Sequence, residues 1–189
     1  MGNNASNVTA GKPKIGGAIF SATLGTAVPT SVNDEITGFT CVGYISEDGV
    51  SNDNSPSSTD VKEWGGSTVL PIQNDRPDTF KWTMLETMEV TVKKLIYGED
   101  NVSVDEETGE IKTKASSEEL EAHAYVIDMA LRDGAKQRLV IHEGKITQLD
   151  TIKYANNSAV GYGVTVSAIP DEDGYTHYDY TLKSEEISG

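Results

Sequence analysis

The sequence predicts a mainly β domain, a sandwich or partly open barrel with one amphipathic helix. Three observations support this fold class. Many short segments alternate between apolar and polar residues, turn signals such as Asp-Gly separate them at regular spacing, and only one stretch has helical periodicity. This pattern is typical of sandwiches and barrels. The chain of 189 residues is long enough for one domain with its own core.

The N-terminal part begins with a polar arm, followed by two apolar runs. Residues 1–14 are rich in Asn and Ser and carry lysines but no acid. We therefore expect a flexible arm, either solvated or docked on an acidic face of a neighbouring copy. Strands are expected at 18–23 and 39–46. Cys41, the only cysteine, lies in the second run and is expected to pack as a small core residue.

A long polar loop is expected at residues 47–60, between two strands. Val50 is its only large apolar residue, so the loop cannot bury itself, and long structureless loops in compact domains are functional or disordered. We therefore predict that the loop contacts a partner surface and becomes ordered on assembly. Trp64, just beyond the loop, either anchors that interface or caps the domain's own core. The candidate contact residues are Glu47, Asp48, Gly49, Val50, Trp64, Gly65 and Gly66.

The stretch that follows changes its period from strand to helix. A strand is expected at 67–73, where Pro71 indicates an edge or a bulge. Strict alternation at 78–84 predicts a strand with one buried face. Apolar residues then recur at helical spacing from Leu85, acids precede lysines, and Gly98 ends the predicted helix, whose apolar side packs on the sheet. The predicted core residues are Phe80, Trp82, Met84, Met88, Val92 and Ile96.

The second half is predicted to be a succession of hairpins. Thr108-Gly109 centres one hairpin within 101–114, and Asp133-Gly134 indicates another. A helical turn is expected at 116–123. Asp173-Gly174 predicts the last turn, and residues 184–189 are expected to form a C-terminal tail after the domain at 15–183. The expected strands are 125–131, 137–142, 146–154, 160–168 and 176–182.

The charge of the chain argues against several partners. A formal net charge of −15 and a pI near 4.5 disfavour stable binding to nucleic acid and to anionic membranes, since both need clustered Lys and Arg. Solubility alone is an alternative reason for the acidity. The first ten residues lack the apolar core of a signal peptide, and no apolar run is long enough for a bilayer span, so synthesis in a cytoplasm is expected.

No catalytic, cofactor or metal site is expected. His123, His142 and His177 are not at ligand spacing with one another or with the cysteine. The acidic run at 171–174 lacks the later ligands of a calcium loop, so a plain turn is favoured. Neither a phosphate-binding loop nor a nucleophile elbow is present in the sequence.

Several segments resemble the major tail tube protein of long-tailed bacteriophages. They are GGAIFSATLGTAVPT at 16–30, the stretch 43–98 with GYISEDGV, KEWGG and the beginning of IYGEDNV, and AVGYGVTVSAIPDEDGYTHYDY at 159–180. The resemblance extends over about residues 15–182 and implies a structural, non-enzymatic subunit of the virion tail. Six such subunits would close a ring with a continuous β-barrel, and stacked rings would form the conduit for DNA ejection.

The resemblance also implies partners and leaves alternatives open. It implies a tape-measure protein inside the growing tube, a tip or initiator complex, bridging of adjacent rings by the loop at 47–60, and duplex DNA that passes an acidic lumen without stable binding. The inner tube of a contractile injection device is an alternative within the same fold logic. A monomeric β-sandwich that binds glycans or cell surfaces is an alternative from another class.

Overall fold

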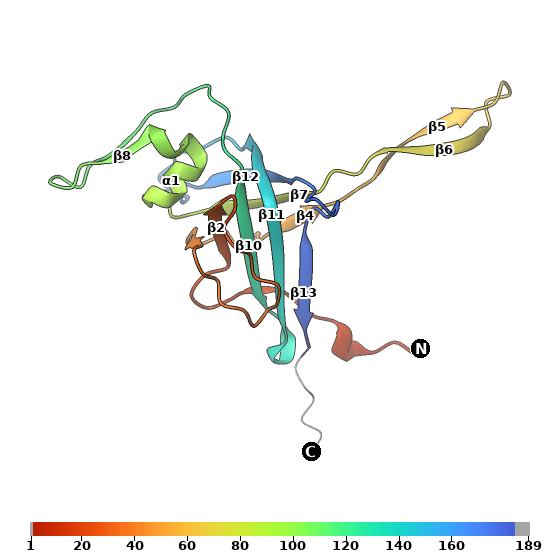
Figure 1. Ribbon diagram of the computed structural model, residues 1–189, viewed down its shortest axis with the longest axis horizontal. Helices are drawn as coiled ribbons and strands as arrows, with labels where there is room; N and C mark the ends of the chain where they lie inside the picture. Colours follow the sequence, from red (N-terminus) through yellow and green to blue (C-terminus); the bar gives the residue numbers. More distant parts are fainter. Residues whose placement is uncertain (1, 184–189) are drawn as a thin grey trace, which may run out of the picture.

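A computed structural model describes residues 2–183, so the predicted tail at 184–189 lies outside the described residues (Figure 1). The fold class is confirmed as mainly β, with one open, curved antiparallel sheet and, among the described residues, one α-helix, α1 (Val90–Tyr97). The strands of this main sheet are β1 (Lys12–Pro13), β2 (Ile19–Thr23), β3 (Thr40–Cys41), β4 (Ser51–Asp53), β7 (Thr79–Met84), β10 (His123–Ala130), β11 (Lys136–Leu149), β12 (Tyr162–Ala168) and β13 (Tyr178–Leu182).

The main sheet runs in the order β3-β2-β10-β11-β12-β7-β4, with β1 beside β10 and β13 beside β11. Two hairpins project from this sheet on opposite sides of the molecule (Figure 1). They are β5 (Ser57–Lys62) with β6 (Thr68–Asp75), and β8 (Val102–Val104) with β9 (Ile111–Thr113). Three short 3₁₀ turns complete the described elements: η1 (Ala5–Asn7), η2 (Glu99–Asn101) and η3 (Arg132–Gly134).

The main sheet curls around the core. Trp82 of β7 and Tyr125 of β10 meet edge to face with ring centroids 5.5 Å apart, although β11 and β12 lie between their strands. In a flat sheet those strands would be roughly 14 Å apart. The concave side therefore encloses the core, and α1 covers it with Val92, Leu95 and Ile96 turned inward. This is the sandwich-like, open barrel that the alternating strands predict.

The strand at 78–84 has the predicted buried face. Phe80, Trp82 and Met84 are buried, while the side chains between them point to the other side of the sheet. Val92 and Ile96 are also buried in the core, on the inner side of α1.

The prediction that Met88 lies in the core is wrong, because its side chain is 82% exposed. The helix begins only at Val90, five residues later than its apolar spacing indicates. The chain before it is held by the Tyr44 backbone, which donates to the Glu86 carboxylate over 2.8 Å and accepts from the Leu85 N–H over 2.9 Å. Gly98, with a φ of 94°, ends the helix as predicted.

The N-terminal segment docks on its own domain instead of forming a free arm. Lys12 and Pro13 form β1 opposite Ala130 and Met129 of β10. The Thr9 hydroxyl accepts a hydrogen bond from the backbone N–H of Arg132. The prediction of a wholly flexible segment at 1–14 is therefore wrong for its second half.

Two turn predictions in the second half of the chain are confirmed. The hairpin around Thr108-Gly109 pairs β8 with β9. Asp133 and Gly134, with φ values of 57° and 81°, connect β10 to β11. The predicted helical turn at 116–123 is not formed.

The predicted break between the strands at 137–142 and 146–154 is wrong, because β11 continues from Lys136 to Leu149, and the predicted end at 154 is wrong as well, since no strand is formed at 150–154. β11 contains a bulge between its pairings Tyr125–Ile141 and His123–Gly144. A Cβ on Gly144 would lie 2.9 Å from the Tyr125 ring. The glycine is therefore required by a close approach within the sheet and does not mark a turn.

Candidate assembly surfaces

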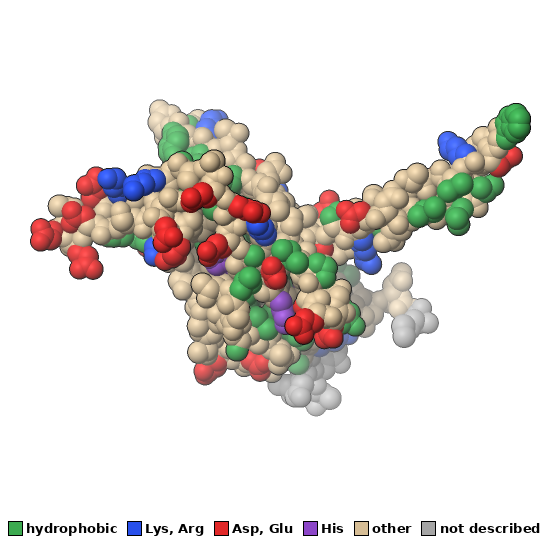
Figure 2. All heavy atoms as spheres, turned by 45° about the horizontal axis from the view of Figure 1, so that its top comes forward, with side chains coloured by type: hydrophobic (Ala, Val, Ile, Leu, Met, Phe, Trp, Pro, Cys, Tyr) green, Lys and Arg blue, Asp and Glu red, His purple; other side chains and the backbone are tan. Residues whose placement is uncertain are grey.

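The β5–β6 hairpin, called the ribbon below, is the most unusual surface of the protein. The prediction that residues 47–60 form a structureless loop is wrong, because residues 51–53 pair with β7 as β4 and residues 57–60 pair with β6 as part of β5. Every residue of β5 and β6 is exposed, and the ribbon extends away from the main sheet (Figure 1). Val61 and Leu70 are cross-strand partners, and Ile72 lies two residues along the same strand face. These three exposed apolar side chains form a stripe, and Figure 2 shows hydrophobic side chains gathered along the ribbon.

The ribbon ends in a turn that presents Trp64 to solvent. Its side chain is 105% exposed, so it does not cap the domain's own core. The Glu63 backbone donates to the Ser67 carbonyl over 2.9 Å, and its carbonyl accepts from the Gly66 N–H over 2.8 Å. Backbone N–H groups of Gly65 and Ser67 that face the Glu63 carboxylate lower the pKa of that residue. The tip is thus an ordered turn built by its neighbours and not a frayed loop.

Gly66 is required by this turn, because its φ of 91° favours glycine. A Cβ on Gly65 would meet only the movable end of the Glu63 side chain, 2.5 Å away. Gly66 therefore supports the presentation of the indole two residues before it.

The remaining contact candidates lie at the base of the ribbon. Glu47, Asp48 and Gly49 form an exposed turn in which the Gly49 N–H donates to the Ser46 carbonyl over 2.9 Å. Val50 instead packs against the core, and the chain then enters β4. The predicted contact candidates therefore lie in three places: a turn at the base of the ribbon (47–49), a core contact (Val50) and the ribbon tip (64–66).

Asp78 fastens the ribbon base to the C-terminal part of the chain. Its buried carboxylate accepts hydrogen bonds from Asn52 of β4 over 2.7 Å, from the Thr176 hydroxyl over 2.5 Å and from His177 Nδ1 over 2.6 Å. The His177 ring also meets the Phe80 ring edge to face. Nothing in the sequence indicated this cluster, because Asp78 and His177 are 99 residues apart.

Burial alone would raise the pKa of Asp78, but the hydrogen bonds from Thr176, Asn52 and His177 and the histidine charge hold the pKa below its usual value. A carboxyl with a lowered pKa stabilises the fold above its unfolded pKa of about 3.9, and this contribution is lost as pH falls through the lower folded pKa. Asp78 therefore contributes to stability at neutral pH and contributes less in acid.

We expect Asp78→Asn to lower the free energy of unfolding at pH 7 by roughly 2–3 kcal/mol, because charged hydrogen bonds are lost. The difference from the native protein should shrink as the pH falls below the unfolded pKa toward the lowered folded pKa of Asp78, because the native carboxyl then becomes protonated as well. Urea unfolding at several pH values measures it, with the exposed Asp48→Asn as the matched control. An unchanged difference between pH 7 and pH 2 would contradict the assignment.

A second buried charge holds the loop at 24–39. Arg138 of β11 makes two bonds to the Asp128 carboxylate, 2.6 and 2.8 Å long, and its Nη1 donates to the carbonyls of Ser31 and Asp34 over 2.7 and 2.9 Å. Lys14 also pairs with Asp128 over 3.1 Å. Burial opposes the charge of Asp128, yet the bonds from Arg138 and Lys14 hold its pKa below the usual value. Charge pairing across the β10–β11 hairpin thus fixes a long loop onto the sheet.

The convex side of β7, β12 and the end of β11 carries small hydroxyl side chains. We call this surface the hydroxyl face. Its members point away from the core, opposite Phe80, Trp82, Val164 and Val166. Lys81 lies among them and pairs with Asp150 over 3.0 Å, so its charge is compensated. The hydroxyl face consists of Thr79, Thr83, Thr147, Thr165 and Ser167.

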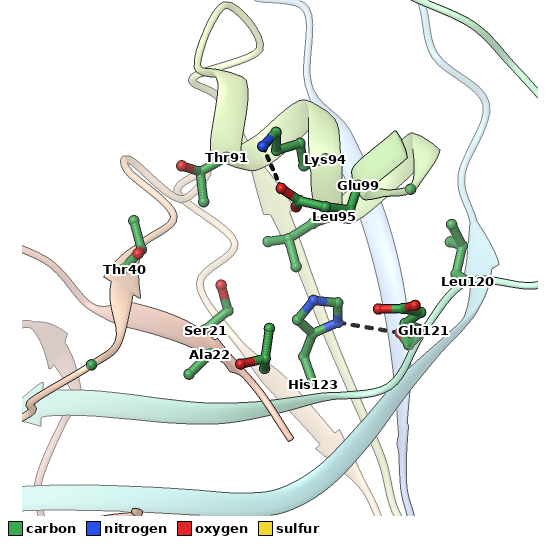
Figure 3. A pocket seen from close by; sticks show the side chains of 13 residues that line it. Ser21, Ala22, Thr40, Thr91, Lys94, Leu95, Glu99, Leu120, Glu121 and His123 are labelled. Atoms are coloured by element: carbon green, nitrogen blue, oxygen red, sulfur yellow. Dashed lines mark hydrogen bonds and ion pairs between the residues drawn. The ribbon is translucent and has the colours of Figure 1, made fainter. Parts of the chain in front are cut away.

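A cavity of about 340 Å³ lies between α1 and the β2–β3 end of the sheet. Figure 3 shows Thr91, Lys94 and Leu95 of α1 on one wall, with Ser21 and His123 facing them from the sheet. Leu120 and Glu121 close another side. Lys94 pairs with Glu99 at the rim.

The acidic hairpin tip and the histidines complete the polar features. The β8–β9 tip carries Asp105, whose carboxylate accepts from the N–H groups of Glu107 and Thr108. His142 packs on the Tyr178 ring. Within residues 2–183, no three His, Cys, Asp or Glu side chains are placed to hold a metal ion. None of the described helices is long and apolar enough to cross a membrane.

Comparison with known proteins identifies one family. A family model described as phage tail tube protein matches residues 1–186. No curated protein matches the sequence. The chain is similar to the tube terminating cap of an anti-feeding prophage, at 10% identity and a TM-score of 0.42, over 96% of this chain and 100% of the other. It is also similar to a chain in the sheath-tube complex of an extracellular contractile injection system in its extended state. That match has 7% identity and a TM-score of 0.43, over 90% of this chain and 93% of the other.

Proposed function

Because the chain belongs to the phage tail tube protein family and is a structural subunit of the virion tail, we propose that six copies close into a ring and that the rings stack into the conduit for DNA ejection. The ribbon is the observation that carries this proposal. A two-stranded hairpin with an exposed apolar stripe and an exposed indole is unfavourable on a free monomer. Contact with another copy buries that surface.

The open sheet supplies the ring contacts. β3 and β4 are its edge strands, and the outer backbone groups of an edge strand are free to pair with another chain. Joining β3 of one copy to β4 of the next continues the sheet around the ring and removes both edges. The curvature that brings Trp82 to Tyr125 gives each subunit its share of the barrel wall.

The ribbon supplies the contacts between rings. Its tip residues Trp64, Gly65 and Gly66 and the turn Glu47–Asp48–Gly49 at its base face an adjacent ring. Val50 supports that turn from inside the domain. Further partners are a tape-measure protein within the growing tube and a tip complex that starts it, all made in the cytoplasm of a bacterial host.

Electron microscopy of the purified protein in negative stain tests the proposal, with sedimentation over a range of concentration and salt. Rings or tubes are expected at high concentration, with sixfold averages in end views. A species that stays monomeric at every concentration and after prolonged incubation would rule out the tube. Rings of another symmetry would overturn the number of subunits but not the assembly.

The hydroxyl face is proposed to line the lumen. Its hydroxyl side chains are small and uncharged, and its two lysines are paired, Lys81 with Asp150 and Lys145, which lies opposite Ser167, with Glu119, so it offers phosphates no free cation. Counterion-release binding needs unpaired Lys or Arg. DNA then passes without adhering to the wall.

We expect no measurable affinity of the assembled tube for duplex DNA at about 150 mM salt, since cationic contacts with phosphates are missing. Thr165→Lys, directly opposite Lys81 in the sheet, should create a salt-dependent affinity, whereas Thr165→Ser should not. Filter binding at several salt concentrations measures it. A map of the tube whose lumen is dominated by Lys and Arg would overturn the sliding argument even if the tube itself is found.

The ribbon is expected to gain protection on assembly. An isolated two-stranded hairpin is marginal in water, so the amides of β5 and β6 should exchange rapidly in the monomer and slowly in the tube. Hydrogen exchange of both states measures this, with β10 and β11 as an internal reference that is slow in each. Ribbon amides already as slow as β10 in the monomer would contradict folding on assembly.

A further inference from the structure

The cavity beside α1 has the size and lining to hold one large aromatic side chain. Its volume of about 340 Å³ lies at the lower end of ligand pockets, which begin near 300 Å³. Leu95, Leu120 and Ala22 contribute apolar surface, and hydroxyl groups of Ser21 and Thr91 lie around them (Figure 3). An indole pairs a large apolar ring with one N–H donor, so it suits a mixed lining of this kind.

We propose that Trp64 at the ribbon tip of one copy inserts into the α1 cavity of a copy in the adjacent ring. This inference rests on the proposed stacking of rings and names its docking site. Trp64 is the most exposed large apolar residue among the described residues. The backbone hydrogen bonds of the turn around Glu63 direct the indole away from the domain.

The positions of the two surfaces permit this contact between copies. The ribbon extends from one end of the molecule, and α1 lies toward the other end (Figure 1). A contact between two different surfaces is heterologous, and it repeats from copy to copy along a stack. Each subunit in the interior of the tube then uses its ribbon once and its cavity once.

One charged side chain without an ion pair lies beside each surface, and the two have opposite sign, while the Glu63 carboxylate at the tip faces the backbone N–H groups of its own turn. Lys62 is next to the tip, and its ammonium group has no ion pair or side-chain hydrogen bond with any part of the chain that the structure describes. The Glu121 carboxylate at the cavity is likewise unpaired within residues 2–183, because only its backbone carbonyl meets His123. Lys94 is already paired with Glu99, which leaves Glu121 as the free charge. Docking Trp64 brings Lys62 toward this carboxylate.

The first experiment compares critical concentrations for tube formation by light scattering and microscopy. Trp64→Ala should raise the critical concentration at least about 30-fold, the effect of losing one hot-spot residue. Met88→Ala, which removes another highly exposed apolar side chain, should leave it unchanged. Thr91→Trp, which fills the cavity from α1, should act like Trp64→Ala, and the double variant should be no worse than either. Thermal melts of the monomers establish that each variant folds.

The second experiment exchanges the charges. Lys62→Glu and Glu121→Lys should each weaken assembly, and the double variant should restore it. In a Cys41→Ala background, Lys62→Cys with Glu121→Cys should form a disulfide between copies only in tubes.

The outcomes separate the docking site from the proposed function. If the native protein forms no tubes under any condition, stacking fails and the docking fails with it. If tubes form and Thr91→Trp assembles like the native protein, the docking is overturned while the tube function stands. Loss of assembly in Trp64→Ala alone, without an effect at the cavity, places the indole elsewhere and also overturns the proposal.

Discussion

Arg138→Met is expected to lower the free energy of unfolding by about 3–5 kcal/mol, because it leaves the buried Asp128 carboxylate without its main partner. The substitution also removes the donors to the carbonyls of Ser31 and Asp34, so the loop at 24–39 should detach from the sheet. Urea unfolding at pH 7 measures the loss of stability, and proteolysis within the loop measures its release.

The matched control is Arg132→Met, because Arg132 makes an exposed pair with Asp133. Exposed pairs contribute about 0–1 kcal/mol, so this variant should behave nearly like the native protein. Replacing both partners, as Asp128→Leu with Arg138→Met, should recover much of the stability, since no buried charge then lacks a partner. Equal losses of unfolding free energy in the Arg138 and Arg132 variants would show that the buried pair stabilises the fold no more than an exposed pair does.

Replacing residues 57–75 by a short Gly-Ser linker is expected to give a folded monomer that no longer stacks into tubes. Every residue of the ribbon strands is exposed, so the core loses nothing, while the stripe and the indole disappear from the surface. Circular dichroism and thermal melts measure the fold, and sedimentation measures assembly.

The ends of this deletion matter. A shorter deletion that began at Val50 would remove a core contact and β4, and would unfold the domain instead of testing the interface. The substitutions Val61→Ser, Leu70→Ser and Ile72→Ser together should reproduce the loss of assembly without shortening the chain. Tubes formed by the deletion variant would exclude the ribbon from the contact between rings.

Local pattern predicted the elements that have one buried face. The strand containing Phe80 and Trp82 alternates because its two sides meet core and solvent. The turn at Asp133-Gly134 and the helix end at Gly98 were also predictable, since positive φ values are required there. The ribbon was only half predicted, because a strand exposed on both sides has no alternation to detect.

Contacts between distant segments account for the rest. Met88 has helical spacing, but the bond from Tyr44 to Glu86, 42 residues away in sequence, delays the helix. The Asp78 cluster joins residues from three parts of the chain. The sequence left Trp64 either as an interface anchor or as a cap on the core, and its exposure excludes the cap. The cavity could not be predicted, because it forms only where α1 crosses the β2–β3 end of the sheet.

The opposite placement of ribbon and α1 gives the subunit a direction. Under the proposed docking, a stack built from such subunits has unlike ends, one with free indoles and the other with vacant cavities. Elongation at the two ends therefore differs in rate and in the surface it requires. A starting complex can select one end by offering a single kind of surface, and a terminating protein can stop growth by occupying the other without imitating the whole subunit. Polarity of the tube follows from the geometry of one chain.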